Sequence, residues 1–346
     1  MTDSTQDIPD LSDAALAARL QARLDNKTKP QGALGRIEAL ALRIGTILGT
    51  DDPMLEAPQM LVCAGDHGLA ARGVSAYPSD VTWQMVENFL AGGAAVSVLA
   101  RQHGLALTVV DCGVRRDFQA RAGLVSRRIA AGTADASAGP AMSAAQCAQA
   151  IANGREVVRA LPGNALLLGE MGIGNSSSAA LLLSRLARLR IDDCTGIGTG
   201  LDAAGLARKR EVLRQVLALH ASATAPLDAL AAFGGFEIAT LVGAVLQAAA
   251  ERRVIVLDGF IASSAVLVAQ ALQPQVLQRC VAAHCSAEPG HLLLLERLGL
   301  DPLLSLDLRL GEGSGGALAW PLLESACRIL REMASFEAAG VSRKDA

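Results

Sequence analysis

The stretch ALLLGEMGIGNSSSAALLLSRLARLR, residues 165–190, decides the fold class. It opens with a short apolar run at 165–169, which has the length of a buried strand. Glycines and hydroxyl residues follow, and residues 176–190 then have the composition of a helix. A strand that passes through a glycine turn into a helix is half of a βαβ unit.

The same alternation of apolar run and helical segment recurs from about residue 59 onward. Apolar runs occur at 59–65, 105–111, 254–258 and 279–284, and helical segments are predicted at 81–102, 260–272 and 287–298. Strands that alternate with helices predict an α/β fold with a parallel sheet and helices on both faces.

Two further helices are predicted before the sheet and one after it. The first runs from Ser12, as a possible N-cap, to about Leu24, and the second ends near Leu48. Residues 1–10 are predicted to be disordered. A strong helix follows the run LGEGSGG and ends at about Phe336.

Composition narrows the classes of protein to consider. The 346 residues are 51% hydrophobic but only 3% aromatic, so the core must be aliphatic and there are few side chains on which bases could stack. A net charge of -3 argues against a nucleic-acid partner. The seven scattered cysteines favour free thiols in a reducing cytoplasm.

No targeting or membrane segment is expected. The N-terminus, MTDSTQDIPD, is acidic and polar, unlike a signal peptide. The most apolar stretch, 254–272, contains Asp258 and divides into strand, turn and helix, so a membrane span is rejected.

Polar residues stand where the predicted strands end. They are Asp66, His67, Asp111, Glu170, Asp258 and His284. Ligands of open α/β sheets bind at this edge, which favours a site there over solvated loops. A carboxylate and imidazole mixture could also hold two metal ions, although no paired-ligand motif is present.

Two glycine clusters could hold a phosphate. In GEMGIGNSSS, 169–178, the glycines allow close approach of the backbone, and the following helix start offers N–H groups. An ordinary glycine turn with a serine cap is the alternative. The second cluster, at 195–202, follows Asp192 and Asp193, as in the acidic loop of enzymes that use a pyrophosphorylated ribose. That loop should follow a buried strand, whereas here a helical pattern precedes it.

Glu312 lies between glycines in LGEGSGG. Flanking glycines permit an unusual backbone turn and leave the side chain accessible. A carboxylate in that setting suits a general base, and it could equally be a helix cap.

Long motifs along the chain resemble one enzyme family. They include TKPQGALGRIE (28–38), SAYPSDVTWQMV (75–86), GEMGIGN (169–175), SAEPGH (286–291) and LRLGEGSGG (308–316). Together these motifs resemble the nicotinate-nucleotide–dimethylbenzimidazole phosphoribosyltransferase family over nearly the whole chain after residue 24. The resemblance implies a Rossmann-like fold, with a large domain at 59–324 and a small helical domain from 1–58 and about 325–346.

The resemblance also implies an activity and its site. The family converts nicotinate mononucleotide and 5,6-dimethylbenzimidazole into α-ribazole 5′-phosphate and nicotinate, and it works as a homodimer. Because this reaction releases no pyrophosphate, no metal ion or cofactor is expected. Glu312 would be the general base, and Glu170 and Lys209 would act near the reacting centre. The wall of the base pocket would comprise Ser75, Tyr77, Gln84, Met85 and Leu310, and the other candidate binding residues are Gly172, Gly174, Asn175, Ser176, Gly198, Thr199, Gly200 and Ser286.

Two positions depart from the family's pattern. Ile197 and Cys285 stand where the family usually has arginine. We expect Lys29, Arg36 or Lys209, or backbone N–H groups, to neutralise the substrate anions instead.

The implied chemistry requires few groups. One benzimidazole nitrogen attacks C1′ while the other loses a proton, so one base is needed, and the pyridine leaves without an acid. Glu170 would stabilise positive charge on the ribose in the transition state. Two alternatives remain: a transferase of the same fold with another acceptor base, and a non-catalytic mononucleotide-binding protein.

Overall fold

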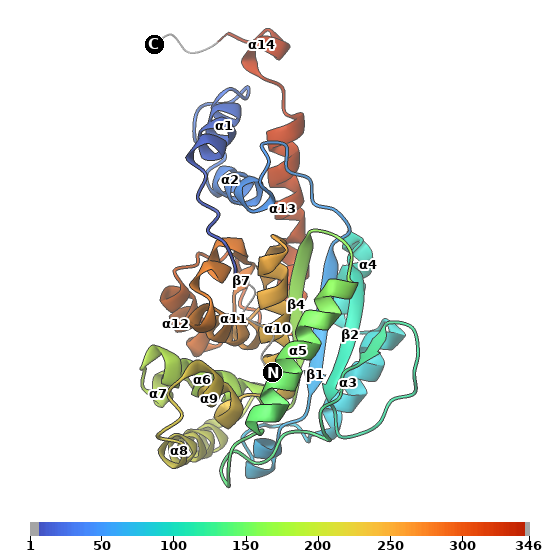
Figure 1. The fold of residues 1–346 in the computed structure, drawn as a ribbon, viewed down its shortest axis with the longest axis vertical. Coiled ribbons are helices and arrows are strands. Elements are labelled where there is room, and N and C mark those ends of the chain that lie inside the picture. The colour runs from blue at the N-terminus through green and yellow to red at the C-terminus, as the bar shows by residue number, and fades with distance from the viewer. Residues whose placement is uncertain (1–6, 343–346) are drawn as a thin grey trace.

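The computed structural model describes residues 7–342, and its centre is a six-stranded parallel sheet (Figure 1). The strand order is β3-β2-β1-β4-β5-β6. Their bounds are β1 Gln59–Gly65, β2 Ala106–Gly113, β3 Leu124–Ser126, β4 Ala165–Met171, β5 Val254–Leu257 and β6 Cys280–Ala282. The predicted α/β fold with a parallel sheet is confirmed. The order reverses between β1 and β4, because the chain builds outward to β3 before it returns to the other side of β1.

Alternate residues of each strand enter two separate hydrophobic clusters, one on each face of the sheet. On β1, Leu61 and Cys63 belong to the first cluster, and Met60, Val62 and Ala64 belong to the second. The predicted helices on both faces are therefore confirmed. The first face is covered by α5 Ala144–Ala160, α6 Asn175–Ala187, α8 Ala203–Leu219, α9 Pro226–Phe233, α10 Phe236–Ala250, α11 Phe260–Leu272 and α12 Pro289–Leu298. The second is covered by α1 Ala14–Asp25, α2 Arg36–Leu48, α3 Asp80–Ala91, α4 Ala95–His103 and α13 Ser314–Glu332.

The central helix α10 was not predicted from the sequence. Every residue from Phe236 to Ala249 is buried, so the helix lacks the polar stripe by which surface helices are recognised. It crosses α5 where both helices carry glycine. A Cβ atom on Gly154 or Gly243 would stand 1.9 Å from a carbonyl oxygen of the other helix, so the two backbones are in direct contact.

The terminal helices pack together at one end of the molecule. Figure 1 shows α1 and α2 beside the part of α13 that extends beyond the sheet. Their buried side chains, such as Leu20 on α1 and Leu323 on α13, belong to the same cluster as Val62 in the sheet. A separate helical domain from the two termini stays a prediction.

The N-terminal predictions need correction in two places. Asp13 rather than Ser12 caps α1, because its carboxylate accepts a hydrogen bond from the Leu16 N–H, whereas the Ser12 hydroxyl donates to Asp10. The predicted disorder over 1–10 is wrong for residues 7–10, where Ile8 is buried in the first cluster. The rest of that prediction lies outside the described residues.

Several predicted elements are divided or shorter. The helix predicted at 81–102 is two helices, because Gly92 adopts a left-handed conformation after α3. The helix predicted at 176–190 ends at Ala187, with Arg188 left-handed. The strand predicted at 279–284 divides into β6 and β7 His284–Cys285, and β7 pairs with β8 Leu304–Ser305 in a separate sheet. Likewise, α13 ends at Glu332, before a short helix α14 Phe336–Ala339.

Other expectations agree with the structure. The segment 254–272 is the strand β5 and the helix α11, and within residues 7–342 no helix is long and apolar enough to cross a membrane. Asp192 and Asp193 lie in a short helix, α7 Ile191–Cys194, which agrees with rejection of the acidic-loop match. All seven cysteines are free thiols.

Candidate active site

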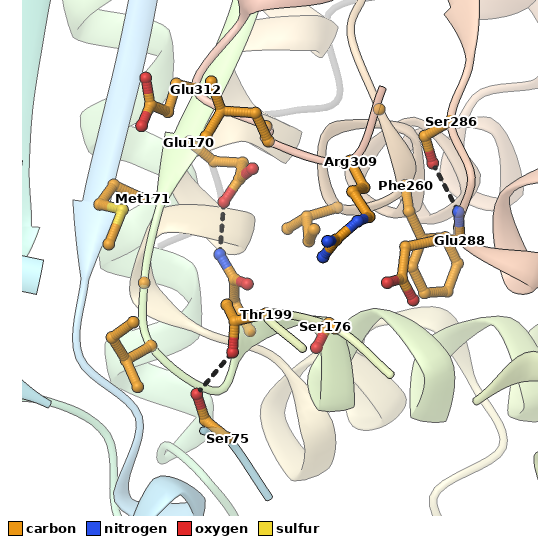
Figure 2. A pocket seen from close by; sticks show the side chains of 18 of the residues that line it. Ser75, Glu170, Met171, Ser176, Thr199, Phe260, Ser286, Glu288, Arg309 and Glu312 are labelled. Carbon is orange, nitrogen blue, oxygen red and sulfur yellow. Dashed lines mark hydrogen bonds between the residues drawn. The ribbon is translucent and has the colours of Figure 1, made fainter. Parts of the chain in front are cut away.

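A cavity of about 710 Å³ lies at the carboxyl ends of the strands, beside the point where the strand order reverses. Ligands of doubly wound sheets bind at such a point, because helices leave the sheet in opposite directions there. The end of β4, the turn before α11 and the segment 307–312 contribute to its lining. Figure 2 shows Glu312, Glu170 and Met171 on one side of the cavity, and Arg309, Phe260 and Glu288 on the other.

Glu312 lies in a turn of three consecutive left-handed residues. The φ angles are 79° at Gly311, 68° at Glu312 and 94° at Gly313. A left-handed residue other than glycine costs about 1–2 kcal/mol, so the turn holds Glu312 in a conformation it would not adopt alone. Gly169 on β4 makes room for the turn, since a Cβ there would stand 2.4 Å from the Glu312 carbonyl oxygen.

The Glu312 carboxyl group is buried and only partly satisfied. Its Oε2 has no hydrogen-bond partner, and the backbone N–H of Val96 at the start of α4 donates to the group. Burial, and then the negative charge of Asp258, raise the pKa of Glu312 to about 7. A base with a pKa near the working pH can take a proton and release it again, as general-base catalysis requires.

Glu170, at the end of β4, is protonated more readily still. Burial, followed by the charges of Asp258 and Glu237, raises the pKa of Glu170 to about 8, although a hydrogen bond from the Asn175 side chain opposes the shift. At neutral pH the group is therefore mostly neutral. Since an adjacent positive charge favours the ionised carboxylate, a cationic substrate would lower this pKa.

The amino end of α6 provides a place for an anion. Gly174 precedes the helix with a φ of 98°, and the first N–H groups of a helix have no partners within it. Lys209 lies behind this turn, where its Nζ donates to Ser176 Oγ at 2.9 Å and to the Gly196 carbonyl oxygen at 3.2 Å. The free N–H groups of the helix start and the ammonium group of Lys209 together suit the binding of a phosphate.

Burial lowers the pKa of Lys209 to about 8, against the opposing effect of Glu288. The Glu288 carboxylate lines the cavity, and its Oε2 is buried without a partner. The lysine therefore carries its charge most readily when an anion is near.

The wall of the cavity that includes the end of β4 and the start of α3 is largely apolar. It includes Val81, Met85 and Met171, with Tyr77 and Leu310 at the rim, where 53% and 58% of their surface is exposed. Ser75 joins this wall to the second glycine cluster, since its hydroxyl lies 3.2 Å from that of Thr199. A flat aromatic ring would fit such a wall.

The structure brings most of the predicted site residues to this one cavity. Those that line it are Glu312, Glu170, Ser75, Tyr77, Met85, Gly172, Gly174, Asn175, Ser176, Gly198, Thr199, Ser286 and Leu310. Gln84 and Gly200 do not line it, and Lys209 reaches it only through Ser176. The roles of these residues stay predictions.

Sequence reasoning missed several lining residues. Arg309 points toward the cavity from the segment before Glu312, and Phe260 and Glu288 line it as well (Figure 2). His284, one of the strand-end residues expected at this edge, also lines the cavity. Arg309 and Glu288 both lie inside motifs quoted above, LRLGEGSGG and SAEPGH. Their charge was the available signal.

The remaining strand-end residues hold loops in place. Asp66 accepts a hydrogen bond from the Arg115 N–H at 2.8 Å, and Asp111 accepts from the N–H groups of Gly113 and Val114. His67 binds Glu237 through Nε2 at 2.6 Å. Within residues 7–342 there is no group of three or more His, Cys, Asp or Glu that could hold a metal ion.

The two departures from the family pattern lie outside the cavity lining. Neither Ile197 nor Cys285 lines it. Lys29 is buried in an ion pair with Glu38 at 2.9 Å, and Arg36 donates to backbone carbonyls of residues 301–302, so neither reaches the cavity. Of the cations expected to compensate, Lys209 is the one near the glycine turn.

Known proteins match this chain over nearly its whole length. The profile of a family described as phosphoribosyltransferase matches residues 9–341. A relative from Variovorax paradoxus (strain S110), called nicotinate-nucleotide–dimethylbenzimidazole phosphoribosyltransferase, is 87% identical over all of both chains. One of the same name from Cupriavidus necator is 60% identical over 95% of this chain and 96% of its own.

A solved structure agrees with the fold and with these relatives. The crystal structure of CobT from Thermus thermophilus superimposes with a TM-score of 0.92 at 42% identity, covering 95% of this chain and all of the other. The chain therefore belongs to the nicotinate-nucleotide–dimethylbenzimidazole phosphoribosyltransferase family.

Proposed function

We propose that the protein transfers the phosphoribosyl group of nicotinate mononucleotide to 5,6-dimethylbenzimidazole, a step in assembly of the lower ligand of cobalamin. The products would be α-ribazole 5′-phosphate and nicotinate. Relatives that bear the name of this activity are 87% and 60% identical to the chain.

One observation carries the proposal at the level of chemistry. A single cavity contains a buried carboxyl group with a free oxygen, Glu312, and a helix start backed by a lysine, at Ser176 and Lys209. The first can take a proton from an azole, and the second can hold a phosphate. A transfer from a nucleotide to an acceptor base needs both groups, since the nucleotide carries the phosphate and the base must lose a proton.

The proposed step balances with one base. A benzimidazole nitrogen forms the new bond to C1′ as the bond from C1′ to the pyridine nitrogen breaks, and the electron pair of that bond leaves with the ring. The pyridinium thereby becomes a neutral pyridine, so the leaving group needs no proton. Glu312 accepts the proton from the other benzimidazole nitrogen. Attack opposite to the leaving group gives the α-anomer.

Glu170 would act by charge. The pyridinium of the substrate and the ribose in the transition state both carry positive charge, which favours ionisation of the adjacent carboxyl group. Its hydrogen bond from Asn175 ties it to the turn at the start of α6. The same turn would therefore orient the phosphate and the anion that faces C1′.

The test is direct product analysis. We expect the protein, incubated with nicotinate mononucleotide and dimethylbenzimidazole, to release nicotinate and to form the α-anomer, with full activity in EDTA. Binding without release of nicotinate would identify a non-catalytic binding protein. Faster turnover with another purine-like or phenolic base would identify a different acceptor, and loss of activity in EDTA would support a metal-dependent reaction.

We also propose that the enzyme is a homodimer, as the family resemblance implies, and that it is cytoplasmic, as its free cysteines indicate. The exposed rim residues Tyr77 and Leu310 are apolar surface that an adjacent chain could cover. Light scattering of the purified protein tests the dimer, and a monomer at micromolar concentration would contradict it.

A further inference from the structure

A buried aspartate caps the helix that follows Glu312. Asp258 lies just past the end of β5 and is 1% exposed. Its Oδ2 accepts a hydrogen bond from the Gly313 N–H and its Oδ1 accepts one from the Gly316 N–H, each at 3.0 Å. These are the residue before α13 and the third residue within it, so the carboxylate replaces the side-chain cap that Gly313 cannot supply.

The surrounding glycines show that this contact is built into the site. Gly313 has a φ of 94°, and a Cβ on it would stand 2.6 Å from the Met60 sulfur. A Cβ on Gly315 would stand 2.0 Å from the ring of His284, whose Nε2 lies 3.4 Å from Asp258 Oδ1. The start of α13 can thus approach Asp258 and His284 only because it lacks side chains there.

Glu312 is the residue immediately before this capped start. Since Asp258 fixes the N–H of Gly313, it fixes the peptide that joins Glu312 to the helix. From this geometry we propose that Asp258 is a positioning residue of the reaction, because it holds the left-handed turn that aims Glu312. This inference rests on the proposed function, with Glu312 as general base.

The negative charge of Asp258 acts on Glu312 as well. Asp258 is the charged group that raises the pKa of Glu312, after the larger effect of burial. The other titratable or charged groups near the turn are Glu170 on β4, His284 on β7 and Arg309 on the same segment. The side chain that accepts hydrogen bonds from the N–H groups of Gly313 and Gly316 is that of Asp258, and not that of Glu170 or Arg309.

The test compares Asp258→Asn with a matched control, Asp111→Asn. Asp111 is also a buried strand-end aspartate that accepts from two backbone N–H groups, but those groups, on Gly113 and Val114, belong to a different loop from Glu312. We expect the acid limb of kcat/KM to move to lower pH by about 1 unit in Asp258→Asn, because a like charge is removed from beside the base. The plateau kcat should fall, while KM for nicotinate mononucleotide stays unchanged. In Asp111→Asn, neither the limb nor kcat should change.

Asp258→Ser is the second variant, which keeps a short neutral acceptor should the asparagine fail to fold. A shift in either folded variant supports the inference. An acid limb that stays in place overturns it, and so does failure of both variants to fold when Asp111→Asn folds, since Asp258 would then serve the fold alone. Failure of the proposed function looks different, because the unaltered protein would then release no nicotinate.

Discussion

Replacement of Glu312 by glutamine should stabilise the protein while it removes the activity. The pKa of the buried carboxyl is raised from its ordinary 4.5 to about 7. The difference corresponds to about 3 kcal/mol, since each pKa unit is worth about 1.4 kcal/mol. Because the folded pKa is the higher one, this group favours folding most below pH 4.5, and the benefit is lost as pH rises through 7.

The expected signature is a pH-dependent gain in the free energy of unfolding. At about pH 8, Glu312→Gln should be more stable than the unaltered protein by up to about 3 kcal/mol, and at about pH 4 the two should be nearly equal. Urea denaturation at both pH values measures the gain. Glu332→Gln, at the exposed end of the same helix, is the control and should change stability little at either pH.

Activity should move the opposite way. Glutamine can still accept from the Val96 N–H but cannot take a proton, so kcat should fall by about 10²–10⁴. A variant that is less stable than the unaltered protein at pH 8 would refute the reasoning about burial. Turnover near that of the unaltered protein would refute the assignment of the base.

Three further changes probe the turn at Gly174, the lysine Lys209 and a buried ion pair outside the cavity lining. Gly174→Ala should raise KM for the mononucleotide with a smaller effect on kcat, because a φ of 98° strains any side chain at the start of α6; an unchanged KM would remove this turn from the phosphate site. Affinity for the mononucleotide, measured by calorimetry, should fall above about pH 8 as Lys209 loses its proton. Lys209→Met should bind weakly at all pH values, and a pH dependence equal to that of the unaltered protein would exclude the lysine. Burial lowers the pKa of His67, but the negative charge of Glu237 outweighs burial, so the pKa is raised above its usual 6.5. The ion pair with Glu237 therefore stabilises the fold fully below about pH 6.5, and this stabilisation is lost as the pH rises through the raised pKa. His67→Gln should therefore cost more unfolding free energy at pH 6 than at pH 9, and an equal loss would show that the ion pair contributes nothing.

The parallel sheet could be predicted because its strands are continuous apolar runs. Burial on both faces makes such runs unambiguous in β1 and β4. The same property concealed α10, because a helix that is apolar all round has no periodicity to read. Division of the strand at 279–284 depended on pairing with residues 304–305, which lie some twenty positions away and leave no local signal.

The sequence predicted those parts of the candidate site that follow from the order of strands and turns in a parallel sheet. Strand ends and glycine turns converge at one edge of a parallel sheet, so Glu170 and Gly174 could be placed near each other in advance. The cap that Asp258 gives to α13 could not, because it depends on where a distant helix starts. Lys209 was placed in the site, but its indirect contact through Ser176 came only from packing.

The helix α13 is also a mechanical connection between two parts of the molecule. Its first turn follows Glu312, and its side chains farther along pack against α2 beyond the sheet. A helix of 19 residues is about 28 Å long, so a tilt of about 2° at one end displaces the other by about 1 Å. Misplacement of a reacting group by 1 Å can cost about 10² in rate. A change in how α1 and α2 pack against α13 could therefore displace Glu312 and lower the turnover rate, without any contact with the substrates.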